Sequence, residues 1–147
     1  MSGKVTAIHL RPGRAEPMVS CESARAVPGR GLEGDSFFEK DAWEPGREIT
    51  LIEMEKVREF EEECGSSFTA KDSRRNVVTT GVSLNDLVDR EFHVGDVKLL
   101  GVKLCQPCSH LEQLLELPVR KGLWDKGGLR AQILTEGVIH VGDSVES

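Results

Sequence analysis

The sequence predicts a mostly β protein, an antiparallel β-barrel with a few inserted α-helices, folded as a single domain over residues 1–147. Short apolar segments rich in β-branched residues recur between clusters of glycine and proline, which is the pattern of strands and turns. The predicted helices do not alternate regularly with these strands, which argues against a doubly wound parallel sheet. No linker divides the chain, and 147 residues are enough to bury one hydrophobic core.

The first third of the chain has the pattern of strands. Residues 4–10 (KVTAIHL) alternate in part between polar and apolar side chains, and residues 18–27 (MVSCESARAV) follow a turn signal. Residues 28–37 (PGRGLEGDSF) hold three glycines, which favours a loop or tight turns. Residues 47–53 (REITLIE) predict another short strand.

A helix is predicted over about residues 53–64. Its apolar side chains recur at helical spacing, and its other face is acidic, so we expect one packed face and one solvated face. Gly65 is a suitable residue to end it. The apolar positions are Leu51, Met54, Val57, Phe60 and Cys64.

The rest of the chain again predicts strands with little helix. Residues 74–81 (RRNVVTTG) predict a strand that ends at Gly81, and residues 83–88 are long enough for one helical turn. Residues 91–104 and 138–146 each contain His-Val-Gly-Asp, and Gly-Asp is suited to the turn of a hairpin. We therefore expect each of these two segments to form a β-hairpin with a Gly-Asp turn.

Composition excludes several classes of function. The 25 acidic and 19 basic residues give a net charge of −6, which argues against a nucleic-acid partner. No apolar run is long enough to span a bilayer, so no membrane partner is expected. The first residues, MSGKVTAIHLRPGRAEP, have Arg and His where a signal peptide needs an apolar core, so we expect a cytoplasmic protein.

The cysteines indicate a reactive site in residues 105–112 (CQPCSHLE). Four cysteines are too few for a disulfide scaffold, and a close pair in a reducing compartment favours catalysis, redox chemistry or metal binding. Ser109 and Glu112 fit a capping box, which places Cys108 just before a helix N-terminus. The partial positive charge there favours the thiolate.

Four interpretations of Cys105 and Cys108 remain open on the residues alone. A thioredoxin-type pair needs βαβ alternation, which this chain lacks. A zinc site needs further ligands from His110, Cys64 or Cys21. One thiolate could ligate a metal cofactor or carry sulfur. The two cysteines could instead pack as small hydrophobic residues.

Taken together, the motifs resemble the MOSC domain, which is found in molybdenum-cofactor sulfurases, in the amidoxime-reducing (mARC) proteins and as small stand-alone bacterial proteins. The resemblance covers nearly the whole chain, in order. The matching segments are GLEGD (31–35), REITLIE (47–53), RRNVVTTG (74–81), FHVGD (92–96), CQPCSHLE (105–112), GGLRAQIL (127–134) and GVIHVGD (137–143).

The resemblance implies a β-barrel fold, a molybdenum cofactor (molybdopterin) and a role for one cysteine. Cys108 aligns with the cysteine that is the molybdenum ligand or the sulfur-handling thiol. Arg74 and Asn76 align with residues that contact the pterin phosphate. Arg75 stands where larger members have proline, and Pro107 stands where they have arginine.

Other basic residues could also serve a phosphate-bearing pterin, because guanidinium groups bind phosphate in a bidentate manner. Arg47 joins Arg74 and Arg75 as a candidate, and Lys71 and Arg130 are further basic residues. Residues 124–128 precede a predicted strand, and Gly127-Gly128 could form a flexible lip. Trp124 is then either a wall of the pocket or part of the core.

The resemblance implies a reductase of N-hydroxylated compounds that takes electrons from a separate donor protein, with Cys108 as thiolate ligand or sulfur carrier. An alternative is a non-catalytic carrier of sulfur or cofactor, which would need a sulfur donor or acceptor protein and no resident cofactor. A third is a small dithiol oxidoreductase that uses Cys105 and Cys108 together. A monomer and a homodimer are both compatible with the sequence.

Overall fold

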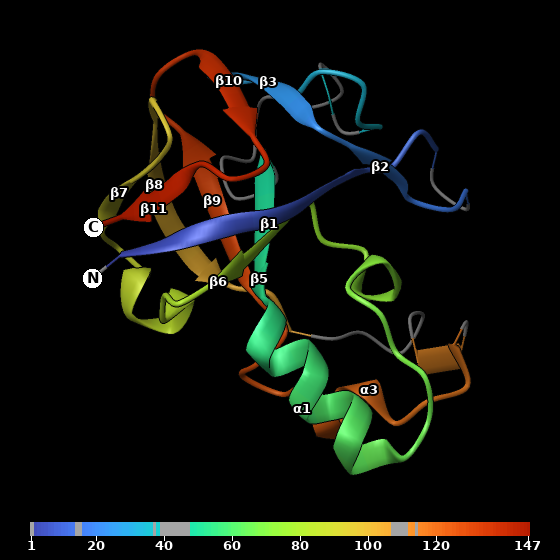
Figure 1. Ribbon diagram of the computed structural model, residues 1–147. Coiled ribbons are helices and arrows are strands. Elements are labelled where there is room, and N and C mark those ends of the chain that lie inside the picture. Colours follow the sequence, from blue (N-terminus) through green and yellow to red (C-terminus); the bar gives the residue numbers. More distant parts are fainter. Residues whose placement is uncertain (1, 14–15, 37, 39–47, 107–111, 114) are drawn as a thin grey trace.

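The computed structural model describes residues 2–13, 16–36, 38, 48–106, 112–113 and 115–147 (Figure 1). Strands dominate these residues, as the sequence predicts. The strands are β1 (Ser2–Leu10), β2 (Val19–Cys21), β3 (Ser23–Val27), β4 (Gly31–Leu32), β5 (Ile49–Glu53), β6 (Val77–Thr80), β7 (Glu91–Val94), β8 (Val97–Leu104), β9 (Leu129–Ile133), β10 (Gly137–His140) and β11 (Ser144–Glu146). The helices are α1 (Met54–Cys64), α3 (Val119–Gly122) and the 3₁₀ helices η2 (Lys71–Ser73) and η3 (Leu84–Leu87).

Among the described residues, seven strands close into a barrel. Their spatial order is β11-β7-β8-β9-β5-β6-β1, and β1 pairs with β11 to close the ring. Within these pairings β5 and β6 run parallel, while the other neighbours are antiparallel. The prediction of a mostly β barrel with few helices is therefore confirmed.

One predicted hairpin forms and the other does not. β7 and β8 pair across the Gly95-Asp96 turn. In the second case β10 pairs with β3, whereas β11 pairs with β1 and β7. The Gly142-Asp143 turn thus carries the chain from a small sheet of β10, β3 and β4 into the barrel. Turn chemistry fixes the local bend, but the partners of each strand depend on which apolar surface it can cover.

α1 confirms the predicted helix and covers the outside of the barrel (Figure 1). It ends at Gly65, whose positive φ of 67° suits a left-handed cap. Its buried Phe60 meets Phe68 edge-to-face, with 4.8 Å between ring centroids. A second hydrophobic core therefore lies between α1 and the barrel, apart from the core inside the barrel. The one-turn helix predicted at 83–88 appears as η3.

Strand alternation divides side chains between these two cores. Leu51 and Val77 point into the barrel, while Ile52 and Val78 belong to the outer core under α1. No described helix is long and apolar enough to cross a bilayer.

Candidate functional site

The segment Arg74-Arg75-Asn76 lies between η2 and β6, on the outer side of the barrel. Arg74 ends η2 with a positive φ of 60°, and Asn76 directly precedes β6. Cys108 and Arg47, the other residues predicted for the site, lie outside the described residues. The geometry of the described site therefore rests on residues 74–76 and on the segments that contact them.

Asn76 is buried, at 7% exposure, and its side chain bonds to three separate segments. Its Nδ2 donates to the carbonyl of His9 at 3.1 Å and to Oδ1 of Asp35 at 3.2 Å. Its Oδ1 accepts from the backbone N–H and the hydroxyl of Thr50, both at 3.1 Å. We call these four residues the Asn76 cluster. It joins β1, β5 and the turn after β4, and so fixes the position of the arginines just before it.

Asp35 brings the GLEGD turn into this cluster. Its Oδ1 also accepts from the backbone N–H of Arg11 at 2.8 Å. Its own N–H donates to the carbonyl of Leu32 at 3.0 Å, which closes a tight turn, as predicted. Gly31 has a φ of 106°, and a Cβ there would lie 3.0 Å from the carbonyl oxygen of Glu48, so glycine suits this close approach.

Arg75 connects the Asn76 cluster to the segment that leads into β9. Its Nε donates to the carbonyl of Gly127 at 2.8 Å. The backbone N–H of Cys105 donates to the carbonyl of the adjacent Gly128, also at 2.8 Å. The fold therefore brings Arg75 and the start of the cysteine motif to two neighbouring peptide groups, although 30 positions separate Arg75 from Cys105.

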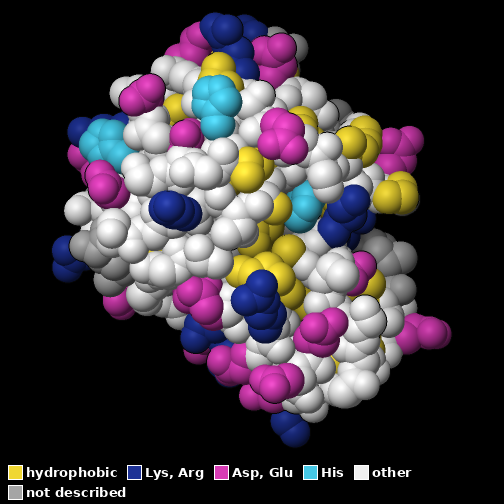
Figure 2. All heavy atoms as spheres, in the orientation of Figure 1, with side chains coloured by type: hydrophobic (Ala, Val, Ile, Leu, Met, Phe, Trp, Pro, Cys, Tyr) yellow, Lys and Arg dark blue, Asp and Glu magenta, His cyan; other side chains and the backbone are white. Residues whose placement is uncertain are grey.

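Further basic side chains lie nearby. The guanidinium of Arg74 donates through Nη2 to the carbonyl of Glu16 at 2.9 Å. Arg130 of β9 lies opposite Thr50 of β5 in the sheet, so the two side chains share one face. In the orientation of Figure 1, the surface has a hollow that contains hydrophobic side chains, with Lys or Arg and a histidine at its edge (Figure 2).

Cys105 is 3% exposed and follows β8 directly. This degree of burial is typical of a cysteine that packs as a small hydrophobic residue. The described cysteines, Cys21, Cys64 and Cys105, form no disulfide. Burial raises the pKa of the Cys21 thiol, which makes it a poor nucleophile. Within the described part of the chain, no group of three or more His, Cys, Asp or Glu side chains is placed to hold a metal ion.

His9 is a member of the cluster that the sequence did not reveal. Its backbone N–H donates to the carbonyl of Asn76 at 2.7 Å, and the residue is 5% exposed. Its Nδ1 is buried without a hydrogen-bond partner in the structure. Burial, and then the charge of Lys71, lower the pKa of His9. The sequence signal for this role was a single histidine within an apolar strand. The alternation of polar and apolar residues along that strand does not show which segments pack over the histidine.

One protein family matches most of this chain. The family model described as "MOSC domain" matches residues 39–146. This chain belongs to the MOSC domain family. No curated protein sequence matches it.

Solved structures share the MOSC fold. The YuaD protein of Bacillus subtilis matches with a TM-score of 0.85 and 17% identity, covering 99% of this chain and 95% of that one. YiiM of Geobacillus stearothermophilus matches with a TM-score of 0.75 and 20% identity, covering 98% of this chain and 74% of that one. YiiM of Escherichia coli matches with a TM-score of 0.73 and 15% identity, covering 97% of this chain and 68% of that one. At these identities the likeness shows a common fold.

The buried histidine gives this MOSC protein a specific pH dependence. In the unfolded chain His9 takes up a proton near pH 6.5, whereas the folded protein resists protonation until the pH is lower. We expect the free energy of unfolding to fall as the pH drops below about 6.5 and this contribution to level off below the lowered pKa. Between pH 7.5 and pH 5, the free energy of unfolding measured in urea will fall less for His9→Gln than for the wild type.

His93→Gln is the matched control, because His93 is exposed on β7. It should keep the pH dependence of the wild type. The interpretation of His9 is wrong if His9→Gln and the wild type lose the same stability over this interval.

Proposed function

We propose that this MOSC protein binds a molybdenum cofactor on the outer face of the barrel and reduces N-hydroxylated compounds with electrons from a separate donor protein. One observation carries the proposal most directly. Arg75 and Cys105 bond to the neighbouring carbonyls of Gly127 and Gly128. The candidate phosphate-binding arginines therefore lie beside the start of the segment that contains the candidate thiolate.

The described residues suit the phosphate of a pterin cofactor. Guanidinium groups bind phosphate through paired N–H donors, and the bond from Arg75 Nε to Gly127 orients the rest of that fork. Arg74 and Arg75 are assigned to the phosphate. Asn76 is assigned to hold these arginines in place, because its amide already bonds to His9, Asp35 and Thr50.

Two further assignments come from the sequence and the family. Cys108 is proposed as the thiolate that ligates molybdenum, and Arg47 as another phosphate contact. When bound, the cofactor supplies a metal that can pass an electron pair to an N–O bond. Reduction of an N-hydroxylated amidine takes up two electrons and two protons, breaks the N–O bond and releases water. The chain itself supplies the cofactor contacts and the position of the substrate.

The proposal is tested by expressing the chain in a host that makes molybdenum cofactor and measuring bound molybdenum and released pterin. We expect stoichiometric metal in the wild type and loss of metal in Cys108→Ser, because a hydroxyl is a much weaker ligand for a soft metal than a thiolate. Cys64→Ser is the matched control, since Cys64 is the last residue of α1 and its thiol donates to the carbonyls of Glu61 and Ser66.

Arginine variants test the phosphate contact in the same assay. Arg74→Ala should weaken cofactor retention by about 10- to 100-fold, the usual worth of a charge-assisted hydrogen bond. Arg58→Ala, which removes an exposed arginine from α1, should retain the cofactor. Absence of metal and pterin from the wild type would contradict the proposal. A persulfide on Cys108, found by mass spectrometry, would then support the sulfur-carrier alternative.

A further inference from the structure

Arg130 of β9 is an arginine whose positive charge has no partner in the described part of the chain. The residue is half-buried, and it forms no hydrogen bond or ion pair with another described residue. A guanidinium group that leaves water without an acceptor or a negative charge costs free energy. An unpaired group of this kind in a folded protein indicates a missing partner, such as a bound ion.

The register of the sheet places a second positive charge directly beside Arg130. Lys103 of β8 is its cross-strand partner, and Leu104 and Leu129 form the next pair. Both leucines pack into the core inside the barrel, so alternation turns Lys103 and Arg130 to the outer face. Like charges that lie directly opposite on a sheet destabilise it. Lys103 is exposed and likewise forms no ion pair with a described residue.

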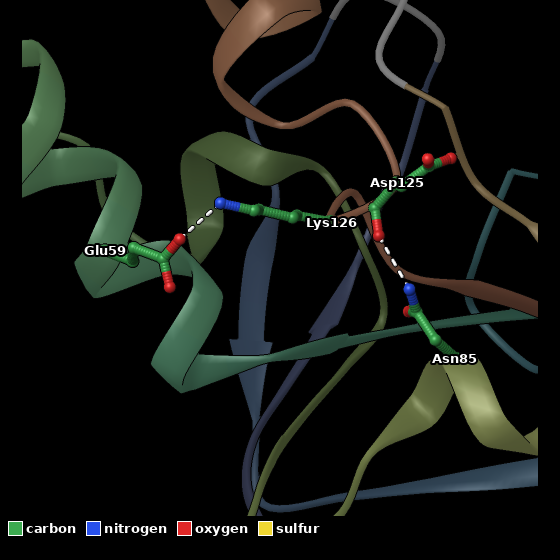
Figure 3. Close-up of polar contacts among 4 residues, drawn as sticks. All are labelled: Glu59, Asn85, Asp125 and Lys126. Carbon is green, nitrogen blue, oxygen red and sulfur yellow. Dashed lines mark hydrogen bonds and ion pairs between the residues drawn. The ribbon is translucent and has the colours of Figure 1, made fainter.

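Other lysines on the adjoining segments do have carboxylate partners. Lys98, on the same strand as Lys103, forms an ion pair with Glu91 at 2.8 Å. Lys126, which precedes β9, forms an ion pair with Glu59 of α1 (Figure 3). The charges of these two lysines are therefore balanced within the protein.

The carboxylates bonded to the segments around β9 already have donors of their own. Oδ1 of Asp125 accepts from Nε2 of Gln106 at 2.6 Å. Oε1 of Glu48 accepts from the backbone N–H groups of Gly29 and Ile133. Within the described residues the Lys103–Arg130 pair thus has no counter-charge, and a bound anion would supply one.

We propose that Lys103 and Arg130 bind the phosphate group of a small phosphorylated molecule on the outer face of the barrel. The fork of a guanidinium group donates two parallel hydrogen bonds to phosphate, and an ammonium group adds a point charge. A phosphate dianion balances both positive charges, whereas a carboxylate balances one. Because β9 pairs with β5 on one side and β8 on the other, the two charges are held in place before the ligand binds.

This site is separate from the one proposed for the cofactor. Arg74 and Arg75 are assigned to the cofactor phosphate, and Nε of Arg75 bonds to the carbonyl of Gly127 rather than to β9 itself. The inference therefore goes beyond the proposed function and does not rest on it. The net charge of −6 disfavours a nucleic acid as the source of the phosphate.

The first test follows the wild-type protein, purified without cofactor, by NMR during titration with inorganic phosphate. Sodium chloride holds the ionic strength constant, so that general screening by salt does not change. We expect saturable shifts of the side-chain Nε–H of Arg130 and of the backbone N–H of Lys103. Acetate should bind more weakly, because it carries a single charge. Absence of saturable shifts at these two groups, or equal binding of acetate, would overturn the inference.

The second test compares the phosphate affinity of charge variants in the same titration. Arg130→Gln should weaken binding by about tenfold or more, the worth of a charge-assisted hydrogen bond. Lys103→Gln should weaken it by about threefold, because water screens an exposed charge. Lys98→Gln is the matched control on the same strand, and it should bind like the wild type because Glu91 already pairs with Lys98. Equal affinity of Arg130→Gln and the wild type would contradict the inference.

A third measurement separates this site from the cofactor site. Protein loaded with molybdenum cofactor should bind inorganic phosphate at Lys103 and Arg130 with unchanged affinity. Loss of phosphate binding on loading would mean that the cofactor occupies these residues, and would overturn the assignment to a separate molecule. Phosphate binding by a protein that retains no molybdenum in any preparation would support this inference and contradict the proposed function.

Discussion

Asn76→Asp will lower the free energy of unfolding by about 3–5 kcal/mol, although the new side chain has nearly the same shape. The substitution removes the donor that Asn76 supplies to the carbonyl of His9 and to Asp35. It also places a second carboxylate against Oδ1 of Asp35 at a buried position, where like charges repel strongly. Urea unfolding at pH 7.5 measures the effect.

Asn85→Asp is the matched control. Asn85 is exposed, and its Nδ2 bonds to the carbonyl of Asp125. The same chemical change there should cost at most about 1 kcal/mol, because water solvates the new charge. Comparable losses in the two variants would mean that the Asn76 cluster does not hold β1, β5 and the turn after β4 together.

Gly128→Ala will lower the free energy of unfolding by about 3 kcal/mol or more. Gly128 has a φ of 111°, and a Cβ there would lie 2.1 Å from the carbonyl oxygen of Leu51 in β5. Backbone atoms must separate to accommodate it, so the start of β9 moves away from β5. The amide of Cys105, which donates to Gly128, should then exchange its hydrogen faster.

Gly142→Ala separates backbone strain from steric overlap. Gly142 has a similar φ of 97°, but no atom lies within 4 Å of a Cβ placed there. Strain alone should cost about 1 kcal/mol in urea unfolding. If the two alanine variants are equally stable, the contact with Leu51 does not determine the position of β9.

The buried carboxylate of Glu48 has a comparable structural role near the same strands. Its Oε1 accepts from the backbone N–H groups of Gly29 at 2.8 Å and Ile133 at 3.3 Å. Burial raises the pKa of Glu48, and these two donors partly oppose the shift. The carboxylate thus joins the turn before β4 to the end of β9, and Arg47 directly precedes it in the sequence.

Local patterns in the sequence were sufficient for the fold class and for much of the secondary structure. The helix stripe that includes Val57 and Phe60 predicts α1, and Gly65 predicts its end, because a helix forms and stops through contacts within a few residues. β-Branched segments between turns predict the strands of the barrel. The ordered motifs predict the MOSC family, which the family model confirms over residues 39–146.

The hairpin predicted across Gly142-Asp143 does not form, which shows the limit of what local sequence patterns can predict. The Gly-Asp turns after β7 and β10 have similar sequences, yet β8 returns along β7 while β11 pairs with β1 and β7 instead of β10. A turn sets the direction of the chain over a few residues. The choice of partner depends on burial of surfaces contributed by distant strands.

The sequence by itself determined a mostly β barrel, the α1 helix, the MOSC family and the candidate residues Arg74, Arg75 and Asn76. Only the tertiary structure decided what these residues contact. Asn76 meets His9, which lies 67 positions away, and Arg75 meets Gly127, which lies 52 positions away. No periodicity or turn signal encodes such pairs, because they form only when closure of the barrel brings β1, β5, β6 and β9 together.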